Sequence, residues 1–152
     1  DYYLAQKLNI KELNDVRLHI EPEVARLAAK NINADDTHRL QRVVDEEYMA
    51  EPIDERVTNL TDFHLVLAEV SGNYFYEIII NVLVSITKEI VNAGYRKGDA
   101  VVHGTGQHNE ILEAVLAHEP DRAAKAMQNH LTKFSNGLIG LEKEYRRRMN
   151  IK

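Results

Sequence analysis

The feature that most constrains the fold of this chain is the helical spacing of its apolar residues, which continues almost from end to end. Leucine, isoleucine, valine and alanine recur every three or four positions, the pattern of helices that bury one face. Glycine and proline, which interrupt helices, number only 7 and 3 among 152 residues. No segment has the alternating pattern of a half-buried strand. The sequence therefore predicts an all-α fold, an antiparallel helical bundle with short loops.

Turn signals divide the pattern into six predicted helices. The first carries an apolar stripe, and Pro22 should kink this helix or leave a short break in it. Its inward residues are Leu13, Val16, Ile20, Val24 and Leu27. The second, shorter helix is marked by Leu40, Val43, Val44 and Tyr48. The remaining four are expected over about 53–70, 74–95, 105–118 and 120–149.

The boundaries around the fourth predicted helix are the clearest. Gly72 suits the left-handed residue that ends one helix, and Asn73 suits the N-cap of the next. The helix over 74–95 is apolar on much of its circumference, which predicts a central position. Residues 94–106 form a glycine-containing connection with a short helical piece expected around 99–103. Pro120 fits the first turn of the last helix.

Length, charge and cysteine content exclude several classes of protein. A length of 152 residues fits one compact domain. The absence of cysteine excludes disulfides and thiolate metal sites, and we expect a cytoplasmic protein. No apolar run approaches the roughly 20 residues of a membrane span. The net charge of −5 argues against a nucleic-acid surface, and Arg146–Arg148 are interpreted as a solvated helix end.

Three of the seven histidines lie among apolar residues on three different predicted helices. His64 shares a helical face with Leu67, while His108 and His130 lie in similar apolar stripes. A single inward histidine is usually a core residue satisfied by a hydrogen bond. Three such residues can instead be satisfied together by one divalent cation in the core of a bundle. Both interpretations remain open for His64, His108 and His130. The other four, His19, His38, His103 and His118, are expected at the surface.

Three segments in order resemble the FCD domain, the effector-binding domain of GntR-type transcription regulators. The segment from Glu12 to Ala29 resembles the opening helix of that domain. Phe63-His64, followed by Leu67-Ala68 and Ser71-Gly72-Asn73, resembles its third-helix pattern. The third resemblance, to its last two helices, lies in His108–Val115, Asp121, Ala124, Met127 and His130-Leu131. The resemblance covers about 12–131 and implies six or seven helices around an effector pocket.

The resemblance also implies a metal. Many FCD domains hold a divalent ion with one aspartate and three histidines, which His64, His108 and His130 match. The aspartate of the family lies four residues before the first histidine, and this chain has Leu60 there. We therefore expect either a zinc- or nickel-like ion held by three histidines with water or effector, or a weak or absent metal. Arg17 matches an arginine that meets an effector carboxylate in some members; alternatively, it forms a surface salt bridge with Glu21.

The function implied by the resemblance is sensing a small carboxylate effector, such as a hydroxy acid or a sugar acid. We expect a homodimer that contacts DNA only through a winged helix-turn-helix domain preceding this chain, and no membrane contact. Since the chain begins at Asp1, it is interpreted as a piece of a longer protein. A metal-dependent enzyme with a three-histidine site is the alternative. That alternative lacks an HExxH motif and a glutamate on the face of a candidate histidine.

Overall fold

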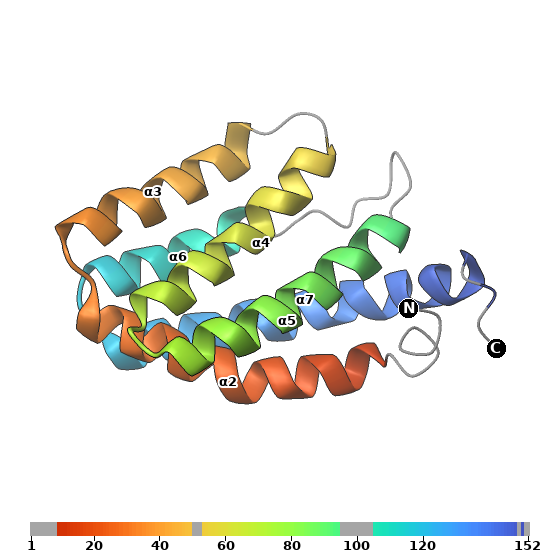
Figure 1. Cartoon of the computed structure of the whole chain (residues 1–152), viewed down its shortest axis with the longest axis horizontal. Helices are drawn as coiled ribbons and strands as arrows, with labels where there is room; N and C mark the ends of the chain where they lie inside the picture. Colours follow the sequence, from red (N-terminus) through yellow and green to blue (C-terminus); the bar gives the residue numbers. More distant parts are fainter. Residues whose placement is uncertain (1–8, 50–52, 95–104, 149, 151–152) are drawn as a thin grey trace.

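The computed structural model describes residues 9–49, 53–94, 105–148 and 150, and these residues form a bundle of α-helices (Figure 1). In chain order the helices are α2 (Ile10–Asn31), α3 (Ala34–Met49), α4 (Ile53–Val70), α5 (Tyr74–Gly94), α6 (Thr105–Leu116) and α7 (Pro120–Arg148). The described residues contain six helices and no strand, as the apolar spacing predicts. None of the described helices is long and apolar enough to cross a membrane.

The long helices α2 and α7 form the spine of the bundle. They pack mainly against each other, and α6 packs on α7 while α4 lies between α3 and α5 (Figure 1). The core is made of apolar side chains from every described helix, including Ala28 of α2, Leu67 of α4 and Met127 of α7. This arrangement brings the inward faces of α2, α4, α6 and α7 toward one another.

The helix boundaries follow local chemistry. The Asn9 side chain caps α2 by accepting a hydrogen bond from the Lys11 backbone N–H at 2.9 Å. Gly72 ends α4 with a φ of +72°, and the Asn73 side chain accepts from the Phe75 N–H at 3.1 Å. Pro120 begins α7, as predicted. The expected helical piece around 99–103 lies outside the described residues.

Three details concern the first predicted helix. First, α2 continues through Pro22, so of the two outcomes expected there, a kink or a short break, the break does not occur. Second, Val16 was predicted inward but is 44% exposed. Third, Asn14, Arg17 and Glu21 are buried instead. Leu13 and Val24 are buried as predicted, but the side of α2 that faces the core also carries these three polar residues, which the apolar pattern does not count.

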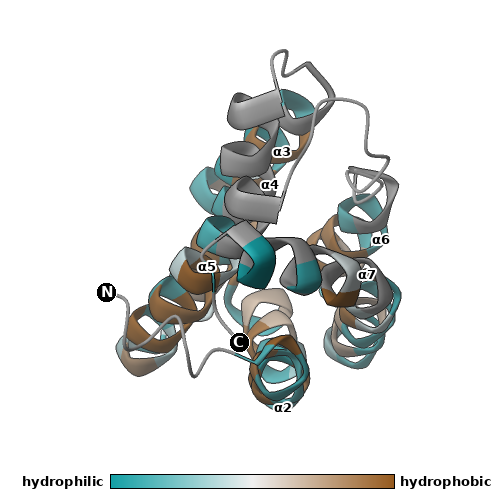
Figure 2. Cartoon of the chain, turned by 90° about the vertical axis from the view of Figure 1, so that its right-hand side faces the viewer, coloured by the Kyte–Doolittle hydropathy of each residue, from teal (hydrophilic) through white to brown (hydrophobic). Residues whose placement is uncertain are grey.

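The predicted central position of the fourth helix is wrong. One face of α5 is exposed along its first half, and Figure 2 shows hydrophobic colouring along this helix. The exposed apolar residues, called the α5 apolar face below, are Tyr74, Phe75, Ile78, Ile79 and Val82. Residues Ile80, Leu83 and Val84 are buried on the other side. The helix is therefore apolar all round because two different surfaces of it are apolar, one packed in the core and one exposed.

Candidate metal centre

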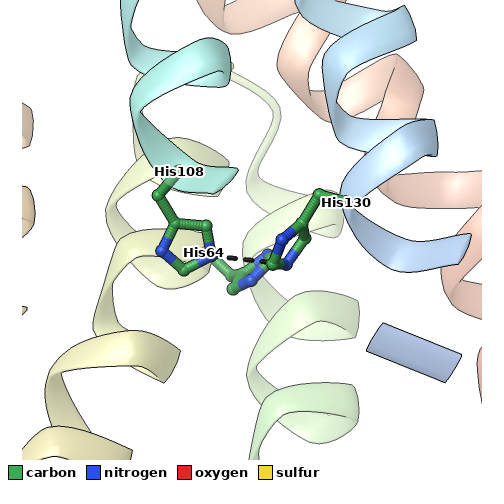
Figure 3. Close-up of side chains that lie close together, drawn as sticks. All are labelled: His64, His108 and His130. Carbon is green, nitrogen blue, oxygen red and sulfur yellow. Dashed lines mark hydrogen bonds between the residues drawn. The ribbon is translucent and has the colours of Figure 1, made fainter. Parts of the chain in front are cut away.

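His64, His108 and His130 come together from three helices at the centre of the bundle (Figure 3). They belong to α4, α6 and α7, and all three side chains are buried. Each offers one ring nitrogen, and these nitrogens lie within 4.8 Å of one another. The structure thus places in one cluster the three histidines that the sequence singled out.

Each histidine faces inward because its helical neighbours do. Leu67 and Ala68 follow His64 by one turn and are buried. Ile111 and Leu112 do the same after His108. Aromatic rings pack around the cluster: Phe63 stacks on His108 with ring centroids 4.4 Å apart. Phe134 stacks on His130 at 6.1 Å. These aromatic neighbours contribute to the burial of the rings.

The spacing of two of the ring nitrogens suits a tetrahedral ion. The Nε2 atoms of His108 and His130 lie 3.3 Å apart. Two nitrogens bound to a tetrahedral zinc at about 2.0–2.1 Å are separated by roughly 3.3 Å. The same separation also permits an N–H···N hydrogen bond, which is the arrangement that the two rings have without an ion.

The electrostatic environment keeps two of the rings neutral. Burial lowers the pKa of His108 well below its ordinary value, and the nearby His64 and Arg17 lower it further. Burial also lowers the pKa of His130, with additional contributions from His108, His64 and Arg17. A neutral imidazole has the free lone pair that binds a metal, so both rings are in the binding form at neutral pH.

A row of polar side chains on α2 adjoins the histidines. Arg17 is 2% exposed and Glu21 is 1% exposed. Arg17 Nε donates to Glu21 Oε1 at 2.5 Å, and His64 Nδ1 lies 2.6 Å from Glu21 Oε2. Burial raises the pKa of Glu21, but Arg17 and His64 outweigh it and hold that pKa well below its usual range. The salt bridge predicted for Arg17 and Glu21 is present, but it is buried beside the histidines instead of lying on the surface.

Glu21 is the residue that the sequence interpretation missed. The sequence indicates Glu21 only as a surface partner of Arg17, because an arginine and a glutamate four residues apart form ordinary surface pairs. The available signal was the helical phase: Asn14, Arg17, Glu21, Val24 and Ala28 share one face of α2, and the last two are core residues. A charge on an apolar face is buried only when it is paired, which is the case here.

Three buried polar atoms on this face have no hydrogen-bond partner among the described residues: Oδ1 of Asn14, Nη1 of Arg17 and Oε2 of Glu21. Oε2 of Glu21 has His64 Nδ1 at 2.6 Å, whereas no ion pair is found for the other two atoms in that part of the chain. Leaving such atoms unpaired costs about 1–3 kcal/mol each. An unpaired guanidinium N–H is suited to an anionic oxygen, and an unpaired amide oxygen to a donor such as a hydroxyl. The α2 face thus offers complementary groups to a small polar molecule.

The remaining site expectations divide into three groups. His19, His38 and His118 are exposed, as predicted, and His118 Nδ1 lies 3.1 Å from the carbonyl oxygen of Ala29. His103 lies outside the described residues. Leu60, at the position of the family aspartate, belongs to α4, but its side chain is outside the described part of the chain.

The donor set fits a divalent metal. Three imidazoles from three helices, two of them held neutral by burial, are ligands that zinc, nickel, copper or iron accept. A carboxylate beside one imidazole is the usual support for such ligands. Three protein ligands leave at least one position for another group on a tetrahedral or octahedral ion.

A family model and curated proteins match this chain. The FCD domain model matches residues 12–133. The chain is 27% identical over 141 residues to the HTH-type transcriptional repressor NanR of Enterobacter sp. (strain 638), covering 88% of this chain and 52% of the repressor. The repressor NanR of Escherichia coli (strain K12) is similar at the same identity and coverage. The chain thus spans about half the length of these curated relatives.

A solved structure shares the fold. The Streptococcus agalactiae GntR structure superposes with a TM-score of 0.71 and 23% identity, covering 90% of this chain and 60% of that one. An identity this low supports the fold alone. The family model, however, extends over most of the chain and includes all three histidines. This chain belongs to the FCD domain family.

Proposed function

We propose that this chain is the effector-sensing domain of a longer, HTH-type transcription regulator. Family membership supports the sensing role, and the curated relatives are named as HTH-type transcriptional repressors. Those relatives are about twice as long as the part that this chain matches. In the proposal a winged helix-turn-helix domain precedes this chain and makes the DNA contacts, in the cytoplasm. The names of the relatives favour a sensor over the metal-dependent enzyme.

The sensing site of the proposal is a divalent metal held by His64, His108 and His130. The single observation that carries it is the convergence of three buried ring nitrogens within 4.8 Å. Zinc or nickel suits this ligand set, and a bound effector completes the coordination. An ion with an open position can bind a carboxylate directly, so the metal would supply the principal contact to an acidic effector.

Arg17 is the second contact in the proposal. Its Nη1 is buried and has no hydrogen-bond partner in the described part of the chain, while its Nε donates to Glu21. The two roles that the sequence left open for Arg17 are therefore compatible, since different nitrogens serve them. An effector with a carboxylate for the metal and Arg17, together with a hydroxyl for Asn14, fits these groups. Hydroxy acids and sugar acids have this chemistry.

A homodimer is the expected assembly, and the α5 apolar face supports it. Its five residues lie on one side of one helix, and the most exposed, Phe75, is 74% exposed. Large exposed apolar patches mark interaction sites. A second copy of this chain is the partner proposed, because one self-complementary patch on each subunit is sufficient for two-fold symmetry. Two sensing domains paired in this way can present two DNA-reading domains to two half-sites.

Elemental analysis of the purified protein, followed by thermal-shift measurements with organic acids, tests the proposal. We expect about one zinc or nickel per chain, and a rise in melting temperature with a hydroxy or sugar acid that requires the metal. Metal-free protein that takes up no added zinc or nickel would rule out the metal centre. Turnover of a stabilising acid by the metal-loaded protein would favour the enzyme instead.

A further inference from the structure

Glu21 contacts both Arg17 and His64, two candidate site residues between which the sequence indicates no link. Its Oε1 accepts from Arg17 Nε, and its Oε2 lies against His64 Nδ1 at 2.6 Å. It is 1% exposed, so water does not compete for either oxygen. The contact with His64 crosses from α2 to α4, so it joins two helices at the centre of the bundle.

This contact favours one tautomer of a neutral His64. A carboxylate only accepts hydrogen bonds, and a neutral imidazole has one N–H. Nδ1 of His64 and Oε2 of Glu21 lie 2.6 Å apart, yet neither atom makes a hydrogen bond of normal geometry among the described residues. Both buried atoms are satisfied if the His64 ring turns so that an Nδ1–H points at Oε2. The proton then sits on Nδ1, and the lone pair of Nε2 is left for a metal.

Glu21 is better placed as a support than as a ligand. Among the described residues, the group of metal-ligating side chains whose donor atoms all lie within 4.8 Å contains the three histidines and not Glu21. One of its oxygens accepts from Arg17 Nε, and the other lies 2.6 Å from His64 Nδ1. A carboxylate that binds the outer nitrogen of a ligating histidine fixes the orientation of the ring and raises its basicity.

We propose that Glu21 is a positioning residue that holds His64 in the Nδ1–H tautomer and links it to Arg17. The proposal rests on the proposed metal function for its consequence, but the tautomer is a property of the metal-free protein. It assigns the acidic support of the site to α2, whereas position 60 on α4 is a leucine. It also makes Arg17 part of the same chain of contacts, so a change at Arg17 reaches His64 through Glu21.

The variant Glu21→Gln gives a sharp test because glutamine has only one acceptor oxygen. Arg17 donates hydrogen bonds and cannot accept them, so it takes that oxygen. The amide NH₂ then faces His64, whose Nδ1 must accept, and the proton moves to Nε2. We expect histidine tautomer NMR of the metal-free protein to report Nδ1–H on His64 in the wild type and Nε2–H in Glu21→Gln. A wild-type His64 protonated on Nε2 would overturn the proposal.

Metal affinity provides the second readout, with Co²⁺ and Zn²⁺ as probes and a competing chelator. Glu21→Gln should weaken binding 10- to 100-fold, the usual effect of removing an outer support. The Co²⁺ absorption spectrum should keep its shape, because the ligands are unchanged. Glu23→Gln is the matched control: it lies on the same helix, makes the same charge change and pairs, among the described residues, with Arg26. Unchanged affinity in Glu21→Gln, or a spectrum showing a lost ligand, would contradict the proposal.

The double variant Arg17→Met with Glu21→Gln separates positioning from general destabilisation. Without Arg17, the single amide oxygen can turn to His64 and accept from Nδ1–H again. We expect the double variant to regain the Nδ1–H tautomer and at least part of the metal affinity. It also removes both buried charges together, so no lone charge stays in the core. A double variant that binds metal no better than Glu21→Gln would refute the positioning role.

Wild-type protein without metal affinity would defeat the proposed function. The tautomer of His64 in the metal-free protein would then still decide whether Glu21 is a positioning residue.

Discussion

His108 and His130 lie with their Nε2 atoms 3.3 Å apart, although they belong to different helices. Two neutral, buried rings at this distance can share only one hydrogen bond, which leaves other ring nitrogens dependent on the surroundings. A divalent ion would replace that one hydrogen bond by two stronger contacts. The pair is therefore the point at which the presence of a metal should have the largest effect on the stability of the domain.

Replacing His108 by Ala should remove the stabilisation that zinc gives to the wild type. Zinc at a thousandfold excess over its dissociation constant raises the free energy of unfolding by about 4 kcal/mol. The His108→Ala variant has one ligand fewer, so its unfolding curve should be nearly the same with zinc and with chelator. Urea unfolding under both conditions measures this. His38→Ala, at an exposed position, is the control and should respond as the wild type does.

Replacing Arg17 by Ala should weaken a carboxylate effector by about 1.5–3 kcal/mol, the value of a charge-assisted hydrogen bond. The same change should lower the free energy of unfolding by about 3–5 kcal/mol, because Glu21 stays buried without its cation. Isothermal titration with the effector and urea unfolding measure the two effects separately.

Arg26→Ala is the control for this comparison, since Arg26 lies on the same helix but pairs with Glu23 and Asp121 near the surface. It should leave effector affinity unchanged and affect stability by less than about 1 kcal/mol. An effector that binds Arg17→Ala as tightly as the wild type would restrict Arg17 to its ion pair with Glu21.

The sequence predicted the helices and the three histidines for the same reason. On α4 the buried Phe63 and Leu67 lie one turn apart and flank His64. On α7 the buried Met127 precedes His130 by three positions, so the same spacing shows which way both histidines face. It could not predict Glu21 or the polar part of the inward side of α2, because the pattern counts only apolar residues. The buried face of α2 is partly polar, and its charges are compensated by tertiary partners that no local pattern reveals.

The apolar pattern also explains why the predicted central position of α5 is wrong. A helix with apolar residues on all sides is central only if all of them find partners in the same chain. Ile80 and Leu83 do so, whereas Ile78 and Val82 remain exposed. From sequence, an apolar surface that serves an interface between molecules looks the same as one that serves the core.

Introducing a charge on the α5 apolar face should disrupt the dimer. In Val82→Glu a carboxylate would have to lose its water on association, while position 82 is 56% exposed in the single chain. We expect sedimentation equilibrium to show a dimer for the wild type and a monomer for this variant at tens of micromolar. Helicity should change little, and the melting temperature of the wild type, unlike that of the variant, should rise with protein concentration. Gln128→Glu, at an exposed position on α7, is the control and should remain dimeric. A wild type that is monomeric, or a Val82→Glu protein that is dimeric, would remove α5 as the interface.

The metal-free protein should lose stability as the pH falls below about 6.5. The pKa values of His108 and His130 are lowered by folding, so the unfolded chain binds more protons in this range. Their contribution is complete above an ordinary histidine pKa of about 6.5 and is lost progressively below it. Each should account for up to about 1 kcal/mol between pH 7 and pH 5.5.

Glu21 adds a second loss at lower pH, because its folded pKa is below the ordinary glutamate value of about 4.3. Its contribution is present above that value and is lost as the pH falls further. Urea unfolding with chelator at a series of pH values measures both steps. His108→Gln should show a smaller loss between pH 7 and pH 5.5, and His38→Gln the full loss. A wild type equally stable at pH 7 and 5.5 would contradict the expected neutral burial of the two rings.

Replacing Leu60 by Asp should strengthen metal binding. Position 60 lies one helical turn before His64 on α4, so both residues have similar directions from the helix axis. An aspartate there adds a negative charge and a fourth ligand to a three-histidine site, and it takes a coordination position from water or effector. We therefore expect Leu60→Asp to bind Zn²⁺ at least tenfold more tightly, and its zinc affinity to depend less on an effector carboxylate.

Leu60→Asn has the same shape as Leu60→Asp without the charge. It controls for the loss of leucine, and its zinc affinity should increase far less. Chelator competition with and without effector measures both affinities. If Leu60→Asp binds zinc no better than Leu60→Asn, the ion does not sit on the His64 side of α4, and the three histidines must be explained as core or effector-contacting residues.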